Sequence, residues 1–403
     1  MKGTPGALEA SRGPNDGAVA RVDVTGGAAS STRRLRILWL IKGLGAGGAE
    51  RLLCNAAEAR DRTAFACEVA YLLPWKSALA GELEALGVPV TCLRGGKEWD
   101  LRWALRLRRM LVRRPVDVVH VHSPYVAGIA RLVVRSLPPR RRPRLVYTEH
   151  LPWSGYVWPT RLLNAATFAL DDAHVAVSRA ARDAVPRWLR GRLHVVVHGI
   201  QLDRVRAQRD SRHEARRELG VSDSDILVGT VGNVRPQKRY PDLLAAARLA
   251  MDADASVRFA AAGSGSDEPE IVRLHGELGL GDRFRFLGYV EDAARFLSAC
   301  DLFVLASEYE GLPVALMEAL ALGLPVVATA VPGIAGEVRD GIEASLVPVG
   351  RPDLLADAIV SLAGAPGKRA ERAEASRARA ERYDLDDAVR RLEGLYRDVS
   401  YRS

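Results

Sequence analysis

The sequence predicts an α/β protein with two Rossmann-like, doubly wound domains in tandem that face a cleft. Three observations support this fold class. The chain has 403 residues, its short apolar runs alternate with segments of helical length, and a polar, charge-rich stretch at residues 201–225 interrupts the alternation. Such alternation is typical of parallel strands joined by right-handed helical crossovers. Because a linker divides the strand-like runs, which are too many for one eight-stranded barrel, we prefer two domains.

The first part of the chain divides into a tail and a domain. Residues 1–34 are rich in Gly, Ala, Ser and Thr and lack the apolar segment of a secretion signal, so we expect a flexible N-terminal tail. The first domain is expected at residues 35–203. Its strands are predicted at the apolar runs 35–41, 67–72, 88–93, 116–121, 145–148, 173–177 and 193–197.

The alternation of apolar runs and helical segments resumes after the linker and predicts a second domain at residues 204–383. Its strands are predicted at residues 226–231, 257–262, 284–287, 302–305, 326–328 and 346–349. Two charged helical segments follow, at residues 368–382 and 386–399. We expect residues 384–403 to form a C-terminal helix that packs back towards the N-terminal domain.

The charge of the chain is unevenly distributed. Residues 1–200 hold 31 Lys and Arg against 16 Asp and Glu, whereas the remainder holds 27 against 33. Because 52 of the basic residues are Arg, which makes bidentate contacts with phosphate, an anionic partner for the first half is one interpretation. A genome rich in G and C, whose codons favour Arg, is the alternative.

Two classes of protein are disfavoured. The longest weakly charged run, residues 319–335, is interrupted by glycine and proline and falls short of the roughly 20 apolar residues that span a membrane. The four cysteines are scattered and lack the paired spacing of a zinc site, which favours a reducing cytosol.

A glycine-rich loop at residues 42–50 follows the first predicted strand and opens a helix. Backbone amides at Gly47 and Gly48 can approach a phosphate closely, because glycine has no Cβ and helix N-termini favour anions. The second strand ends without the acid that binds ribose in dinucleotide enzymes, so that fingerprint is weak. The alternative explanation for these glycines is that the loop is tightly packed.

The second domain opens with a turn after its first strand, and this turn contains Arg235, Pro236 and Lys238. Two cations at this position suit a diphosphate whose charge grows as it leaves. Either side chain could instead be an ordinary solvated residue at a helix start.

Residues 307–327 carry two glutamates, Glu310 at a helix mouth and Glu318 about two turns inside the helix. The amides of Gly311 and Leu312 are expected to face the cleft beside Glu310. An unpaired buried carboxylate costs several kcal/mol, so Glu318 needs a partner. Sugar hydroxyls would supply one, and an internal salt bridge is the alternative.

These motifs resemble those of glycosyltransferase family 4, whose members are retaining, use nucleotide-sugar donors, and have the GT-B fold and an E-x7-E signature. Further segments fall in the family's order. They are residues 47–50, 117–122, 147–150, 177–178, 198–200, 263–265, 286–288 and 333–337.

The resemblance implies a donor site in the second domain and an acceptor site in the first. Glu310 would contact the donor sugar and Glu318 the ribose. Arg235 and Lys238 would hold the diphosphate, helped by Gly47, Gly48, Gly311 and Leu312, and His150 would lie near the transferred sugar. The predicted catalytic residues are therefore Glu310, His150, Lys238 and Arg235.

Two positions depart from the family pattern. Asn233 stands where the family often has Arg, which makes the role of Arg235 less secure than that of Lys238, and residues 331–333 lack a frequent double glycine.

The residues also predict transfer without a metal ion or other cofactor. Two cations and helix N-termini can stabilise a leaving nucleoside diphosphate, and no Asp-x-Asp motif follows the carboxyl end of a predicted strand, where the cleft is expected. We interpret Asp171 and Asp172 as solvated. We prefer front-face attack assisted by the donor phosphate, with a UDP- or GDP-sugar as donor.

The acceptor is expected to be a glycan, a polysaccharide or a lipid-linked molecule. Residues 99–111 and 140–144 mix Trp, Leu and Arg, so they could rest on an anionic membrane surface, although the apolar face could equally pack on the sheet. We expect a cytoplasmic protein, with peripheral association at the inner face of the cell membrane as a further possibility. A nucleotide-sugar epimerase and a non-catalytic basic scaffold for nucleic acid are the alternatives. The preferred function needs no nucleic acid.

Overall fold

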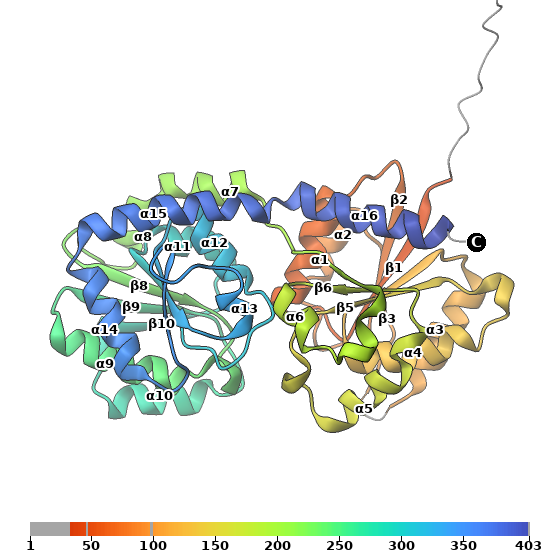
Figure 1. Cartoon of the computed structure of the whole chain (residues 1–403), viewed down its shortest axis with the longest axis horizontal. Coiled ribbons are helices and arrows are strands. Elements are labelled where there is room, and N and C mark those ends of the chain that lie inside the picture. The colour runs from red at the N-terminus through yellow and green to blue at the C-terminus, as the bar shows by residue number, and fades with distance from the viewer. Residues whose placement is uncertain (1–32, 46, 97–99, 402–403) are drawn as a thin grey trace, which may run out of the picture. The chain divides into compact units, whose positions relative to one another are not determined.

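A computed structural model of the chain describes residues 33–45, 47–96 and 100–401, with the side chain of residue 192 excepted. Each apolar run predicted as a strand forms one, and the strands make two parallel sheets with helices on both faces (Figure 1). The prediction of two Rossmann-like α/β domains is confirmed. We call these domains the first and second lobes.

The first sheet has the order β3-β2-β1-β4-β5-β6-β7. Its strands are β1 (Leu35–Ile41), β2 (Phe65–Tyr71), β3 (Val90–Cys92), β4 (Val118–Val121), β5 (Arg144–Glu149), β6 (Ala173–Ala176) and β7 (Leu193–Val195).

The helices of the first lobe include short 3-10 turns, labelled η. They are α1 (Gly48–Ala59), α2 (Ala80–Ala85), α3 (Arg102–Arg113), α4 (Pro124–Arg135), η1 (Pro139–Arg141), η2 (Trp153–Gly155), α5 (Trp158–Thr167), η3 (Phe168–Leu170), α6 (Arg179–Ala184) and η4 (Arg187–Arg192).

The second sheet has the order β10-β9-β8-β11-β12-β13. Its strands are β8 (Ile226–Val231), β9 (Val257–Ala262), β10 (Phe284–Gly288), β11 (Leu302–Leu305), β12 (Val326–Thr329) and β13 (Ala344–Val347).

The helices that precede and surround this sheet complete the chain. They are α7 (Leu202–Ala207), η5 (Gln208–Ser211), α8 (Arg212–Glu218), η6 (Pro236–Lys238), α9 (Tyr240–Ala253), α10 (Glu268–Glu277), η7 (Gly281–Arg283), α11 (Ala293–Ser298), α12 (Val314–Leu322), α13 (Pro332–Ala335), α14 (Pro352–Ala363), α15 (Pro366–Ala380), η8 (Glu381–Tyr383) and α16 (Leu385–Tyr401).

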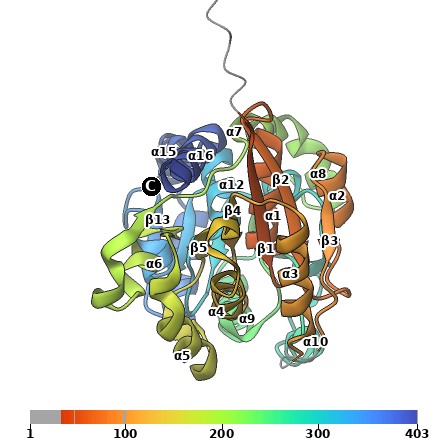
Figure 2. The same cartoon turned by 90° about the vertical axis from the view of Figure 1, so that its right-hand side faces the viewer.

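Strand β1 shows why these apolar runs lie at the centre of a sheet. Successive strand side chains point to opposite faces, and a parallel sheet covered by helices buries both. Ile37 and Trp39 pack into the cluster that contains residues of α1 and α16, whereas Leu38 and Leu40 pack against α3 and α4 on the other face. Figure 2 shows the ribbons of these helices around β1. The run is therefore apolar at nearly every position.

Helix α16 packs on the first lobe, although it follows the whole second lobe in the sequence. Trp39 Nε1 donates a hydrogen bond of 3.0 Å to the buried Tyr396 hydroxyl. The same hydroxyl lies 2.6 Å from His120 Nδ1. The chain reaches α16 past residues 199–200, where the Ile200 amide donates to the Tyr383 carbonyl.

Asp171 is buried, so its interpretation as a solvated residue is wrong. Arg131, on α4, makes an ion pair of 2.6 Å with it, and both side chains are almost fully buried. Its neighbour Asp172 accepts hydrogen bonds from Arg144 and from the Leu145 amide. Asp171 therefore holds helix α4, and Asp172 holds the start of strand β5.

Among the described residues, no helix is both long enough and apolar enough to cross a membrane.

Replacing Tyr396 with Phe removes the hydroxyl shared by Trp39 and His120 and leaves two buried ring nitrogens with one partner fewer. We expect the free energy of unfolding to fall by about 1–3 kcal/mol, the range for unpaired buried polar groups. Urea denaturation monitored by tryptophan fluorescence measures the change. Tyr401→Phe, at an exposed position of the same helix, is the matched control. Equal stability of both variants would contradict the role assigned to the network.

Candidate functional site

The turn after β8 brings Lys238 beside Glu310. Lys238 Nζ lies 2.6 Å from Glu310 Oε1, and both side chains are largely buried. In the same turn, Gln237 Nε2 donates a hydrogen bond of 2.8 Å to the Tyr309 carbonyl. Strands β8 and β11 are neighbours in the sheet, so the segments that follow them meet at one edge.

Glu310 lies between β11 and α12 and is held from several sides. Ser307 Oγ donates a hydrogen bond of 2.6 Å to its Oε1, and Thr329 Oγ1 donates to the Ser307 carbonyl. Its own carbonyl oxygen would lie 2.1 Å from a Cβ on Gly333, so only glycine fits there. This close approach gives Gly333 a packing role that the sequence did not indicate.

Gly311, in the second lobe, contacts residues of the first lobe. A Cβ at this position would lie 1.7 Å from the His150 carbonyl oxygen, which no side chain could tolerate. Ser178 Oγ, from the first lobe, donates a hydrogen bond of 2.9 Å to the Gly311 carbonyl. Leu312 is buried in an apolar cluster that also contains Val177 of the first lobe. The start of α12 is therefore fixed by residues of both lobes.

His150 lies within a group of histidines in the first lobe. Its Nε2 is 3.2 Å from His122 Nδ1, and its ring stacks on His198 with centroids 5.4 Å apart. Burial lowers the pKa of His150 to about 4. The ring is therefore neutral at pH 7.

The loop that carries His150 is anchored by the preceding residue, Glu149. Its buried carboxylate accepts hydrogen bonds from Trp153 Nε1 at 2.6 Å, from the Tyr147 hydroxyl at 3.1 Å and from the Tyr156 hydroxyl. Burial raises its pKa to about 7, against the lowering effect of these three donors. Gly155 in this loop lies against the Tyr309 ring of the second lobe.

The glycine loop of the first lobe faces the start of α12. Gly47 is the N-cap of α1, and a Cβ on Gly48 would lie 3.7 Å from Val314 Cγ2. The Glu50 carboxylate folds back over this helix start, since a Cβ on Gly47 would lie 2.3 Å from Glu50 Oε2. Burial raises the pKa of Glu50, while Lys76 and the exposed Arg235 act in the opposite direction.

Glu318 stands apart from this group. It is partly buried on α12, and no hydrogen bond or ion pair joins it to another described residue. Burial, with a smaller contribution from Asp292, raises its pKa to about 7, and Arg51 opposes this. Arg51 itself pairs with Glu82 at 2.5 Å, so an internal salt bridge does not neutralise Glu318.

The structure thus brings together Glu310, Lys238, Gly311 and the His150 backbone. Gly47 and Gly48 lie at the start of helix α1. The positive charge of Arg235 lowers the pKa of Glu50 in the same helix. Their proposed roles remain predictions. Sequence reasoning missed Ser307, Gln237 and Glu149. Ser307 was open to inference, because a hydroxyl three residues before a buried carboxylate can turn back to it. No group of described His, Cys, Asp or Glu side chains is placed to hold a metal ion.

Two Rossmann-like lobes that meet where α1 and α12 begin define the architecture of a GT-B enzyme, and comparisons with known proteins agree. The family model described as Glycosyltransferase Family 4 matches residues 46–204, and the one described as Glycosyl transferases group 1 matches residues 211–379. N-acetyl-alpha-D-glucosaminyl L-malate synthase from Bacillus anthracis is 27% identical over 75% of this chain and 80% of its own length. A D-inositol 3-phosphate glycosyltransferase from Geodermatophilus obscurus is 39% identical, over 38% of this chain and 36% of its own.

Solved structures share the fold. HepE from Anabaena, in complex with UDP and glucose, has a TM-score of 0.80 and 22% identity, covering 91% of this chain and all of its own. Sucrose-phosphate synthase from Thermosynechococcus elongatus has a TM-score of 0.77 and 20% identity, covering 92% of this chain. The chain belongs to glycosyltransferase family 4, as its motifs predicted, and is a glycosyltransferase.

Replacing Gly311 with Ala forces a methyl group into the His150 carbonyl. We expect the free energy of unfolding to fall by about 1–3 kcal/mol, the range for overpacked positions. Gly276→Ala, in α10, is the control, because nothing lies within 4 Å of its added Cβ. Its free energy of unfolding should stay the same or rise by up to about 1 kcal/mol. Chemical denaturation of both variants checks this, and equal stabilities would contradict the close contact.

Glu318 predicts a specific pH dependence of stability. Because its pKa is about 7 when folded and 4.5 ordinarily, the folded state binds more protons between these values, and stability falls as the pH rises through them. Glu318→Gln removes this effect. From pH 5 to pH 8, the variant should gain about 1–3 kcal/mol of unfolding free energy relative to the wild type. Urea denaturation at both values measures the gain, with exposed Glu371→Gln as control. A pH-independent difference would show that Glu318 is not desolvated.

Proposed function

We propose that this glycosyltransferase transfers a sugar, with retention of anomeric configuration and without a metal ion, from a UDP- or GDP-sugar to a glycan, polysaccharide or lipid-linked acceptor. The observation that carries the proposal is the Lys238–Glu310 pair at the start of α12. It sets a cation for phosphate beside a carboxylate that can accept hydrogen bonds from sugar hydroxyls. The structures of HepE with UDP and with UDP-glucose support a nucleotide-linked donor.

In this proposal the donor diphosphate lies between the two helix starts. Lys238 and Arg235 supply charge, and the amides of Gly48, Gly311 and Leu312 supply hydrogen-bond donors. Gly48 is the first residue of α1, and the first amides of a helix have no partner within it. The Gly47 amide donates to the Gly45 carbonyl, so Gly47 would contribute by letting the phosphate approach the backbone closely. The Glu50 carboxylate covers the start of α1 and would have to move away for a phosphate to bind there. Glu318 would accept hydrogen bonds from the ribose.

The chemistry follows from this placement. The bond between the anomeric carbon and the phosphate oxygen breaks, and its electron pair leaves with the nucleoside diphosphate. The acceptor oxygen bonds to the same face of that carbon, and its proton passes to the leaving phosphate oxygen. Lys238 and Arg235 stabilise the negative charge that develops on the phosphate. His150, neutral at pH 7, positions the sugar and does not act as an acid.

The first lobe would bind the acceptor. Its excess of basic side chains suits an anionic acceptor, and relatives named for L-malate and for inositol 3-phosphate support this. Helix α3 buries Trp103 and Leu107 against the sheet and exposes Leu105 together with Arg109. We include in the proposal that this exposed side rests on anionic lipid at the inner face of the cell membrane, with the enzyme in the cytoplasm. Trp99 lies outside the described residues.

A panel of UDP- and GDP-sugars carrying a radiolabelled sugar tests the proposal with glycan and lipid acceptors. One donor should yield labelled product, with the anomeric configuration conserved by NMR, and activity should survive EDTA. Lys238→Ala should lower transfer by at least about 100-fold, since charge stabilisation is commonly a large catalytic contribution. Lys368→Ala, which removes an exposed lysine, is the control. Isomerised donor without transfer would indicate an epimerase, and loss of activity in EDTA would refute metal independence.

A further inference from the structure

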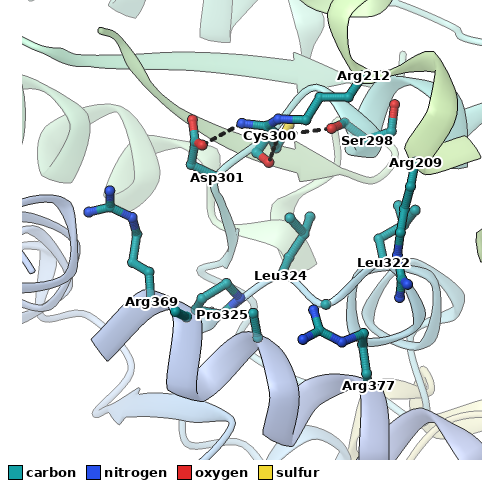
Figure 3. Close-up of a pocket in the computed structure, with 13 residues that line it drawn as sticks. Arg209, Arg212, Ser298, Cys300, Asp301, Leu322, Leu324, Pro325, Arg369 and Arg377 are labelled. Carbon is teal, nitrogen blue, oxygen red and sulfur yellow. Dashed lines mark hydrogen bonds and ion pairs between the residues drawn. The ribbon is translucent and has the colours of Figure 1, made fainter. Parts of the chain in front are cut away.

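The second lobe contains a cavity of about 340 Å³ that none of the predicted donor residues lines. Four arginines from segments far apart in the sequence line it: Arg209 on η5, Arg212 on α8, and Arg369 and Arg377 on α15. In Figure 3 these arginines surround the apolar residues Leu322, Leu324 and Pro325. The cavity therefore combines an apolar floor with a cationic rim.

The lining carries an excess of positive charge. Asp301 is the acidic residue of the lining, and it is already shared by two arginines. Its Oδ1 lies 2.6 Å from Arg212 Nη2, and its Oδ2 lies 3.0 Å from Arg216 Nη1. Asp301 thus neutralises Arg212 and Arg216, and no carboxylate of the described residues forms an ion pair with Arg209, Arg369 or Arg377.

Two of the arginines are explained in part by hydrogen bonds to carbonyls at helix ends. Arg209 Nη2 donates a hydrogen bond of 2.5 Å to the Ala321 carbonyl near the end of α12, and Arg369 Nη1 donates one of 2.7 Å to the Leu362 carbonyl in α14. Cations are favourable at these helix ends. A guanidinium has five N–H donors, however, so each arginine keeps donors to spare.

Arg377 has no such explanation. No hydrogen bond or ion pair joins its side chain to another described residue. Its Nη1 lies over Gly323, 2.6 Å from where a Cβ would be, and Gly323 has a positive φ of 79°. Arg377 and Arg206 also lower the pKa of Arg209, after the larger effect of burial. Arg206 pairs with Glu381, whereas Arg209 and Arg377 have no ion pair with a carboxylate of the described residues.

We propose that this cavity binds a small phosphorylated ligand, whose phosphate or diphosphate contacts the arginines and whose uncharged part lies on Leu322, Leu324 and Pro325. Arginine matches phosphate with paired hydrogen bonds, and the volume lies within the range of small-molecule sites. The site is separate from the proposed donor site, to which helix α12 connects it. Ligand binding here is independent of which sugar the enzyme transfers.

Calorimetric titration of pyrophosphate into the full chain tests the site. The proposed donor site can also bind pyrophosphate, so the titration is repeated in Lys238→Ala, where the arginine cavity should still bind it. Adding Arg377→Gln to that variant should weaken binding about tenfold, the loss of one charge-assisted contact. Adding Arg351→Gln, an exposed arginine of the same lobe that pairs with Asp353, should leave it unchanged.

The possible outcomes separate the two proposals. Loss of all pyrophosphate binding in Lys238→Ala would place the anion in the donor site alone and overturn the second site. Equal affinity with and without Arg377→Gln would also overturn it. Weaker UDP binding by Lys238→Ala than by the wild type reports on the donor site, because Lys238 does not line the cavity, whereas the effect of Arg377→Gln on pyrophosphate binding reports on the cavity. Thermal unfolding of each variant verifies that it is folded.

Discussion

The ion pair between Lys238 and Glu310 is the interaction on which the site depends. A carboxylate that is only 7% exposed is stable when a close cation and further hydrogen bonds replace its lost hydration. Lys238 supplies the charge, and Ser307 supplies a hydroxyl. A donor diphosphate would draw on the same ammonium group. Under the proposed function, the pair would hold the cation in the position from which it contacts the diphosphate.

Backbone packing gives this pair its fixed position. The turn that carries Lys238 lies against Gly263 and Gly265, where an added Cβ would lie about 2 Å from a carbonyl oxygen of residues 232 and 234. Gly333 and Gly311 allow equally close contacts at the Glu310 segment. A close-packed interior has low compressibility, so contacts of this kind leave the two segments little room to move. The geometry of the charged groups is thus set in part by the close backbone approaches that these glycines allow.

Part of the fold and of the candidate site could be predicted from the sequence, because both depend on local sequence patterns. Strands buried on both faces are apolar throughout, as β1 is, and residues that follow neighbouring parallel strands must meet, as Lys238 and Glu310 do. Contacts between lobes could not be predicted in this way. The approach of the His150 carbonyl to Gly311 depends on how two folded surfaces fit. Asp171 was misjudged for a similar reason, since its partner Arg131 lies 40 residues earlier on a helix and no spacing rule connects them.

The crossing of α16 onto the first lobe affects the order in which the protein can be built. Tyr396 completes the buried network of Trp39 and His120, yet the ribosome makes it only after every strand of the second lobe. During translation the second lobe can assemble while the first still lacks part of its core. The first lobe therefore cannot complete its core until the last helix of the chain has been synthesised.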